Sequence, residues 1–200
     1  MDYPVVYKAG VENYAYYESK GYDKQYSKDG VIWADYECTF PELSQNTTLY
    51  GHNWHNIYTP RTQANMQAND LMFSLVMSYN YTDFAQENPF IYFSTTEQDY
   101  VFQVFASYYT DLNFGYNYAQ MSQEDFQKVI AEAKAKSLSN YNVPVTSEDK
   151  IVTLSTCTRV HGNTNNQRFV VMARLLRPGE TIEPVTVTAN TDFKVPNVWG

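Results

Sequence analysis

A cysteine at the end of an apolar run is the residue of this 200-residue sequence best placed for covalent chemistry. Cys157 ends the run Ile151–Cys157 and precedes the polar stretch 158–167, so we expect it at the end of a strand. The thiolate is the nucleophilic form, and a free thiol with a pKa of about 8.5 needs a nearby base or cation to form it at neutral pH. A buried, inert cysteine is the alternative interpretation.

Three histidines are candidates for the base. His52 follows a predicted strand and the turn residue Gly51, His55 lies three residues later, and His161 comes four residues after the cysteine. Nearness in sequence favours His161, but a thiol and its base usually come from separate segments that the fold brings together. The residues alone leave all three open, each against the alternative of a surface or hydrogen-bonded histidine.

An arginine begins the next apolar run. A polar loop of ten residues joins Ile151–Cys157 to Arg168–Leu175, which predicts an antiparallel hairpin with Arg168 near the cysteine at one end of the sheet. A guanidinium there could hold substrate carbonyls or stabilise an oxyanion. A strand-end arginine paired with a carboxylate is the alternative. Arg159 and Arg174 are further candidates, although alternation places Arg174 well along the strand.

Composition narrows the classes of function. The chain carries 14 Lys and Arg against 22 Asp and Glu, a net charge of −8, and therefore lacks the basic footprint of a general nucleic-acid binder. No apolar stretch is long enough to span a bilayer or to resemble a signal peptide. We therefore expect any membrane anchor of the natural protein to be missing from this chain.

The two cysteines exclude a disulfide-dense scaffold and a four-cysteine zinc site. We predict that Cys38 is a semi-buried apolar residue at a strand end. A disulfide between Cys38 and Cys157 would disable the proposed nucleophile, so we predict that none forms.

Strands are the main elements that must position these residues. Apolar, aromatic and β-branched runs predict strands at 31–36, 47–50, 90–94, 100–108, 151–156, 168–176 and 182–188. Helical spacing predicts a helix from Asp70 to Tyr79, a short one from Thr82, and a long one from Ser122 to about Leu138. A short helix is also possible at 11–20. This pattern favours a β-barrel or sandwich that carries helical insertions.

Three segments together resemble the sortase family. Thr153-Leu154-Ser155-Thr156-Cys157 resembles the signature Thr-Leu-x-Thr-Cys, Arg168 follows at eleven residues on a β-branched strand, and Tyr50-Gly51-His52-Asn53 resembles the histidine motif. The long helix before the cysteine strand and the segments 26–36 and 88–93 are similar to class B, and the resemblance covers roughly residues 22–177. Thr158-Arg159 departs from it, because some class B members have an acidic residue there.

The resemblance implies a mainly β fold. This is a closed eight-stranded β-barrel with N-terminal helices and a long helix inserted before the cysteine strand. We expect a single catalytic domain over residues 1–200, with 1–29 as a helical N-terminal extension.

The resemblance also implies a cysteine transpeptidase of Gram-positive cell surfaces. Cys157 would attack the carbonyl of a Thr in a C-terminal sorting motif, giving a thioacyl-enzyme. His52 would protonate the leaving amine and later deprotonate the incoming one. Arg168 would position the substrate and stabilise the oxyanion. Ser155 and Thr156 would lie behind the site or contact substrate, and no metal or other cofactor is expected.

The expected partners are the sorting-signal peptide of secreted surface proteins and an amine of peptidoglycan or of a pilin. Nucleic acid is not expected as a partner. Contact with the membrane is expected only through the missing anchor, at the extracellular face. Three interpretations stay open: a transpeptidase that anchors proteins or polymerises pilins, a hydrolase with the same dyad, and a non-catalytic barrel whose 19 tyrosines bind peptide or glycan. The sequence leaves the sorting motif and the acceptor amine open.

Overall fold

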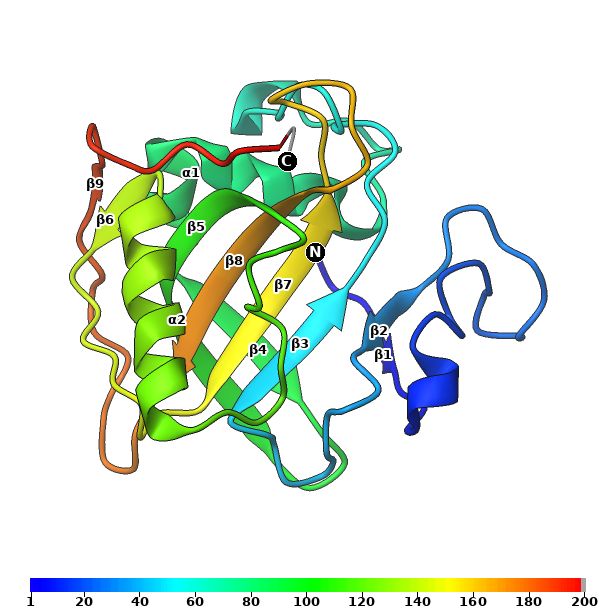
Figure 1. Cartoon of the computed structure of the whole chain (residues 1–200), viewed down its shortest axis with the longest axis horizontal. Helices are drawn as coiled ribbons and strands as arrows, with labels where there is room; N and C mark the ends of the chain where they lie inside the picture. The colour runs from blue at the N-terminus through cyan, green and yellow to red at the C-terminus, as the bar shows by residue number, and fades with distance from the viewer. Residues whose placement is uncertain (199–200) are drawn as a thin grey trace.

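Seven strands hydrogen-bond into one open sheet in the order β1-β2-β3-β7-β8-β5-β4 (Figure 1). The computed structural model describes residues 1–198. The strands of this sheet are β1 (Val5–Val6), β2 (Ile32–Ala34), β3 (Asn46–Tyr50), β4 (Phe90–Ser94), β5 (Asp99–Asp111), β7 (Ile151–Cys157) and β8 (Gln167–Leu175). β6 (Ser139–Tyr141) and β9 (Val187–Ala189) pair separately as an antiparallel ribbon.

Helical segments cover the sheet at several places. The α-helices are α1 (Thr82–Glu87) and α2 (Gln123–Lys136), and the 3-10 segments are η1 (Val11–Asn13), η2 (Gln63–Asn65) and η3 (Met72–Asn80). α2 packs against β5, while η3 contacts β5, β7 and β8. Among residues 1–198, no helix is both long enough and apolar enough to cross a bilayer.

The long helix forms for the reasons that its sequence gives. Ser122 caps it by accepting from the backbone N–H of Asp125, and its first turn is acidic while its last turn is basic. A buried stripe faces the core: Phe126, Val129, Ile130 and Ala133. The expected helix at 122–138 is thereby confirmed, and it precedes the cysteine strand as expected.

The predicted closed eight-stranded barrel is wrong. The main sheet has seven strands, and its edge strands β1 and β4 are not hydrogen-bonded to each other among the described residues. The N-terminal helices are also wrong, since residues 1–29 hold only β1 and the three-residue η1. Pairing of β1 with β2 and the many turns between residues 14 and 29 take the place of helix there.

The last predicted strand, 182–188, is wrong over most of its length. Only Val187–Ala189 is a strand, because β6 is a partner of three residues. The predicted 70–79 helix is a 3-10 segment with a non-helical residue, Phe73, inside it. The other predicted strands and the short helix from Thr82 agree with the structure to within a few residues, whereas β1 and β6 were not predicted.

A buried guanidinium stabilises the end of the sheet away from the cysteine. Arg174 is 2% exposed and donates to Glu180 Oε2 at 2.6 Å and to Gln103 Oε1 at 2.6 Å. Removing one partner of a buried ion pair leaves the other charge buried and unpaired. The carboxylate of Glu180 is therefore a stability determinant of the β8 end.

We predict that Glu180→Ala lowers the free energy of unfolding by about 2–3 kcal/mol, somewhat less than for a fully buried pair because Glu180 is partly exposed. Urea unfolding with an unchanged m-value measures this loss. Glu183→Ala is the matched control, since Glu183 is an exposed carboxylate of the same loop and should change stability by less than about 0.5 kcal/mol. Equal losses in the two variants would contradict the prediction.

Candidate active site

Three neighbouring strands bring the histidine, the cysteine and the arginine into one row. β3 and β7 run parallel with Tyr50 opposite Ser155, so their carboxyl ends meet at one edge and His52 follows two residues beyond the last pair. β7 and β8 run antiparallel with Cys157 opposite Arg168. Directly opposite residues point to the same face of a sheet. The expected hairpin register is therefore confirmed.

A cleft of about 310 Å³ lies over this row. It is formed by an N-terminal segment, β2, the ends of β3 and β7, the start of β8 and the loop after β5. The residues that line it are Tyr14, Ala15, Glu18, Trp33, Asp35, Tyr36, Tyr50, Gly51, His52, Leu112, Tyr116, Asn117, Ser155, Thr156, Cys157 and Arg168. All three candidate catalytic residues thus face one cavity.

Aromatic rings and a backbone carbonyl hold the His52 imidazole. The ring centroid lies 5.8 Å from that of Trp33 and 5.0 Å from that of Trp54. Nε2 contacts the carbonyl oxygen of Glu18. A carbonyl oxygen only accepts, so this contact keeps the hydrogen on Nε2 and leaves Nδ1 as the acceptor of the neutral ring.

Two glycines allow the chain to approach closely around this histidine. Gly30 has φ +60°, and a Cβ there would lie 3.1 Å from both the Glu18 carbonyl oxygen and His52 Cδ2. A Cβ on Gly51 would lie 2.5 Å from Ile32 Cδ1 and 2.7 Å from Phe73 Cγ. Side chains at these positions would displace the segments that hold the imidazole.

The sulfur and the guanidinium are both reachable from solvent. Cys157 is half-buried, and its carbonyl accepts from Asn53 Nδ2 at 3.3 Å, which ties the end of β7 to the chain after His52. Arg168 Nη1 donates to the carbonyls of Asn165 and Gln167 at 3.0 and 2.9 Å. Of its five donors, those on Nε and Nη2 have no partner within residues 1–198. They remain for an oxygen in the cleft.

Hydroxyl groups behind the row are already paired. Ser155 Oγ lies 2.7 Å from the hydroxyl of buried Tyr116, and burial raises the pKa of that phenol. Thr156 Oγ1 donates to the carbonyl of Gly51 at 2.7 Å. The sequence singled out Ser155 and Thr156. In the structure, the hydroxyl of Thr156 connects β7 to the residue before His52, while Ser155 and Tyr116 form part of the floor.

A carboxylate beside the cleft completes a second hydrogen-bonded chain. Tyr50 donates its hydroxyl hydrogen to Asp35 Oδ2 at 2.8 Å and accepts from Asn117 Nδ2 at 2.9 Å. Burial raises the pKa values of Asp35 and of Tyr50. This chain fixes β2, β3 and the loop after β5 against one another around the cleft.

The other histidines and arginines that the sequence suggested lie outside the cleft. His55 is exposed, and the ring of His161 packs edge-on against Tyr109 at 4.6 Å, where burial lowers its pKa. Arg159 donates to Asn165 Oδ1 at 2.7 Å. Arg174 lies well along β8, as alternation predicted. Nearness in sequence is thus a poor guide here, because the polar loop turns His161 away from Cys157.

The two cysteines differ in environment, and both are free thiols, which confirms the prediction that they form no disulfide. Cys38 is fully buried instead of semi-buried and lies beyond the end of β2. Burial raises its pKa to about 12.

Thr158 directly follows Cys157, at the position where the sequence departs from the class B resemblance because some members have an acidic residue there. It is 1% exposed, and its hydroxyl donates to the carbonyl of Ile57 at 3.2 Å. The position therefore serves here as a connection between two loops, and a carboxylate in its place would be buried.

Some cleft residues gave no signal in the sequence. Tyr116 and Asn117 reach the cleft only because their loop folds back over β3, and Glu18 contributes a main-chain oxygen, for which no residue type is diagnostic. Within residues 1–198, no three His, Cys, Asp or Glu side chains converge as metal ligands would.

Comparison with known proteins agrees with this geometry. The model of the sortase domain matches residues 5–176. Sortase B of Staphylococcus aureus is 29% identical over 178 residues, which are 88% of this chain and 66% of that protein. Sortase B of Listeria monocytogenes is 28% identical over 158 residues, 78% of this chain and 58% of that protein. The chain thus spans less than two thirds of the length of either relative.

The solved structure of a Staphylococcus aureus sortase B–substrate complex superimposes with a TM-score of 0.70 and 28% identity, covering 88% of this chain and 74% of that one. The match to the sortase domain covers most of the chain. The two curated relatives and the solved structure are all B-type sortases. The chain belongs to the sortase family and, within it, to class B.

Proposed function

We propose that this chain is a cysteine transpeptidase that cleaves a sorting signal after a Thr and transfers the protein to an amine of the cell wall peptidoglycan. The observation that carries the proposal is the row of His52, Cys157 and Arg168 across three adjacent strands under one cleft. Membership of class B supports the same activity. One chain of residues 1–200 would act as a single catalytic domain at the extracellular face of the membrane.

The first half of the reaction forms a thioacyl-enzyme. The Cys157 thiol gives its proton to His52, and the thiolate sulfur attacks the carbonyl carbon of the Thr, so that the carbon–oxygen double bond opens to a tetrahedral oxyanion. The unpaired donors of Arg168 stabilise that negative charge. As the intermediate collapses, the carbon–nitrogen bond breaks, and the leaving amine takes a proton from protonated His52.

The second half reverses the proton transfer. The incoming amine attacks the thioester carbonyl, and His52 removes the proton that this nitrogen loses. The sulfur leaves and the new amide is released. Because Nε2 is held by Glu18, Nδ1 is the position at which the imidazole gains and loses this proton.

Ser155 and Thr156 act as positioning residues in this proposal. The hydroxyl of Thr156 fixes the carbonyl before His52, and that of Ser155 fixes the ring of Tyr116 beneath the cysteine. Partners of the chain would be the sorting-signal peptide of secreted surface proteins and the acceptor amine. A pilin amine is the alternative acceptor.

We predict that Cys157→Ala abolishes cleavage of a sorting-motif peptide, because no other exposed thiol is present in the described chain. Arg168→Ala should lower turnover by about 10²–10³, the usual effect of removing one oxyanion donor. Arg168→Lys keeps the charge but loses the planar donor geometry, and should recover only part of the loss. Cleavage followed by chromatography measures all three variants, and near-normal turnover of Arg168→Ala would make this arginine structural.

The two thiols should differ in alkylation. Only the thiolate reacts, and burial raises the Cys38 pKa to about 12. We therefore predict that iodoacetamide at pH 7–9 modifies Cys157 and spares Cys38, with labelling of Cys38 appearing only as the pH approaches 12 or the protein unfolds. Peptide mass spectrometry locates the label. If Cys38 were modified as fast as Cys157 in the folded protein, the prediction that burial protects Cys38 would be contradicted.

A hydrolase would share the thioacyl step and pass the acyl group to water. We predict that added oligoglycine or diaminopimelate diverts the product from the free acid to the amide, since the cleft admits an amine beside His52. Mass spectrometry of the products, with and without amine, distinguishes the two activities. A free acid alone at every amine concentration would favour the hydrolase.

A further inference from the structure

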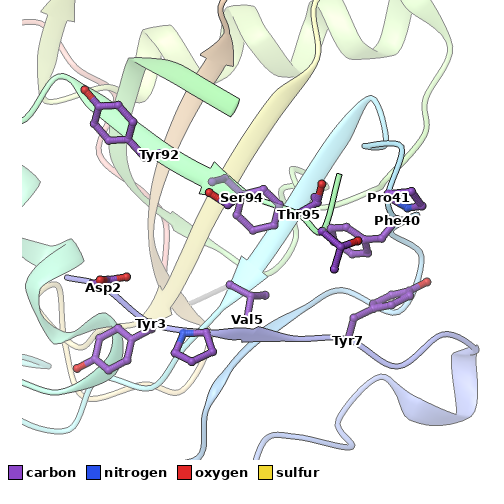
Figure 2. A pocket seen from close by; sticks show the side chains of 12 residues that line it. Asp2, Tyr3, Val5, Tyr7, Phe40, Pro41, Tyr92, Ser94 and Thr95 are labelled. Atoms are coloured by element: carbon purple, nitrogen blue, oxygen red, sulfur yellow. The ribbon is translucent and has the colours of Figure 1, made fainter. Parts of the chain in front are cut away.

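A second and larger hollow lies where the sheet fails to close. A groove of about 1040 Å³ separates the free edges of β1 and β4. Figure 2 shows Tyr3, Val5 and Tyr7 of the N-terminal segment on one side of this groove and Tyr92, Ser94 and Thr95 on the other. None of its lining residues also lines the catalytic cleft. The groove is therefore a separate feature of the surface.

The β4 edge of the groove presents unpaired backbone groups. Val104 N donates to the Pro89 carbonyl and Thr95 N to the Gln98 carbonyl, both at 2.9 Å, which sets the alternation along the β4–β5 ladder. The backbone groups of Tyr92 and Ser94 accordingly point away from β5. They make no hydrogen bond within residues 1–198. This row of free donors and acceptors is what an added strand pairs with.

The side chains of the groove are apolar inside and aromatic at the rim. Phe40 lies between the β1 and β4 edges. Its ring centroid is 4.9 Å from that of Tyr7 and 6.2 Å from that of Phe93. Tyr92 is 68% exposed. Alternate side chains of an added strand would thus meet the apolar floor, and those between them would lie beside tyrosine rings and solvent.

The one charged side chain among the residues that line the groove is acidic. This side chain is that of Asp2; Glu97 lies in the turn that follows β4, and Asp99 begins β5 directly after it. None of these three carboxylates forms an ion pair within the described residues. Carboxylates and exposed tyrosine faces both attract lysine and arginine side chains. A cationic occupant is therefore complementary to this surface, and an acidic one is not.

We propose that an extended segment of a partner protein, with lysine or arginine alternating with apolar residues, binds in this groove as a strand paired with β4. The unpaired edge favours a peptide over a glycan, because a glycan offers no regular array of amide groups to complete the ladder. Such a strand would occupy the gap in the sheet and leave the catalytic cleft untouched.

Fluorescence anisotropy with a labelled Lys-Val-Lys-Val-Lys-Val-Lys peptide tests the proposal. We expect saturable binding to the unaltered protein that weakens as salt increases, and no binding of the Glu-Val analogue. Ser94→Pro removes an outward N–H, and the proline ring also obstructs pairing with an added strand. Together these two effects should weaken binding of the peptide about tenfold or more. Ser94→Ala keeps the N–H and should bind as the unaltered protein does, while Asp2→Lys should bind the cationic peptide several-fold more weakly.

Cleavage of a sorting-motif peptide should be unchanged in the Ser94 and Asp2 variants, which shows that they fold and separates this proposal from the catalytic one. Should Ser94→Pro not fold, a peptide N-methylated at alternate residues makes the same test on the unaltered protein and should fail to bind. The proposal is overturned if the cationic peptide shows no saturable binding or if the acidic peptide binds equally well. It is also overturned if folded Ser94→Pro binds the peptide fully, or if the methylated peptide binds fully. Binding of a chitin oligosaccharide in place of the peptide would overturn it as well.

Discussion

The in-register pairing of β3 with β7, and of β7 with β8, is the constraint on which the site depends. The first pairing is parallel and the second antiparallel, so the end of β3, the end of β7 and the start of β8 coincide at one edge of the sheet. A slip of one residue in either ladder would turn Cys157 and its neighbours to opposite faces. The chemistry of a thiol, an imidazole and a guanidinium from distant segments thus rests on main-chain hydrogen bonds.

Buried polar side chains keep that register fixed. Asn46 donates to the carbonyl of Tyr116 at 2.8 Å and accepts from the hydroxyl of Thr153 at 2.7 Å, all inside the protein. These bonds connect β3, β7 and the loop after β5, whose Tyr116 hydroxyl in turn lies against Ser155. A satisfied buried network tolerates only one arrangement, because any shift would leave a polar group unpaired away from water. The floor of the cleft is therefore held before substrate arrives.

Local sequence signals predicted the parts of this site that local physics determines. Alternating β-branched residues and a ten-residue polar loop were enough to place Arg168 opposite Cys157, and the capping residue Ser122 was enough to place the long helix. The sequence did not predict that the sheet stays open or that residues 1–29 are mostly irregular, because both depend on which distant edges meet. The contact from Glu18 to His52 was equally invisible, since it uses a carbonyl that every residue has.

The floor of the cleft is built from paired strands, whereas the chain that covers it is irregular. Cys157 and Arg168 lie on strands that are paired on both sides, whereas His52 lies on a loop and is held by an exposed segment. That segment is attached near the site through the Glu18 carbonyl and through the Lys28 carbonyl, which accepts from Trp54 Nε1 at 3.1 Å. Segments with few buried contacts open at lower free energy than core strands. In the proposed mechanism, the His52 side of the site would therefore adjust to the leaving amine and to the incoming amine, while Cys157 and Arg168 keep their places.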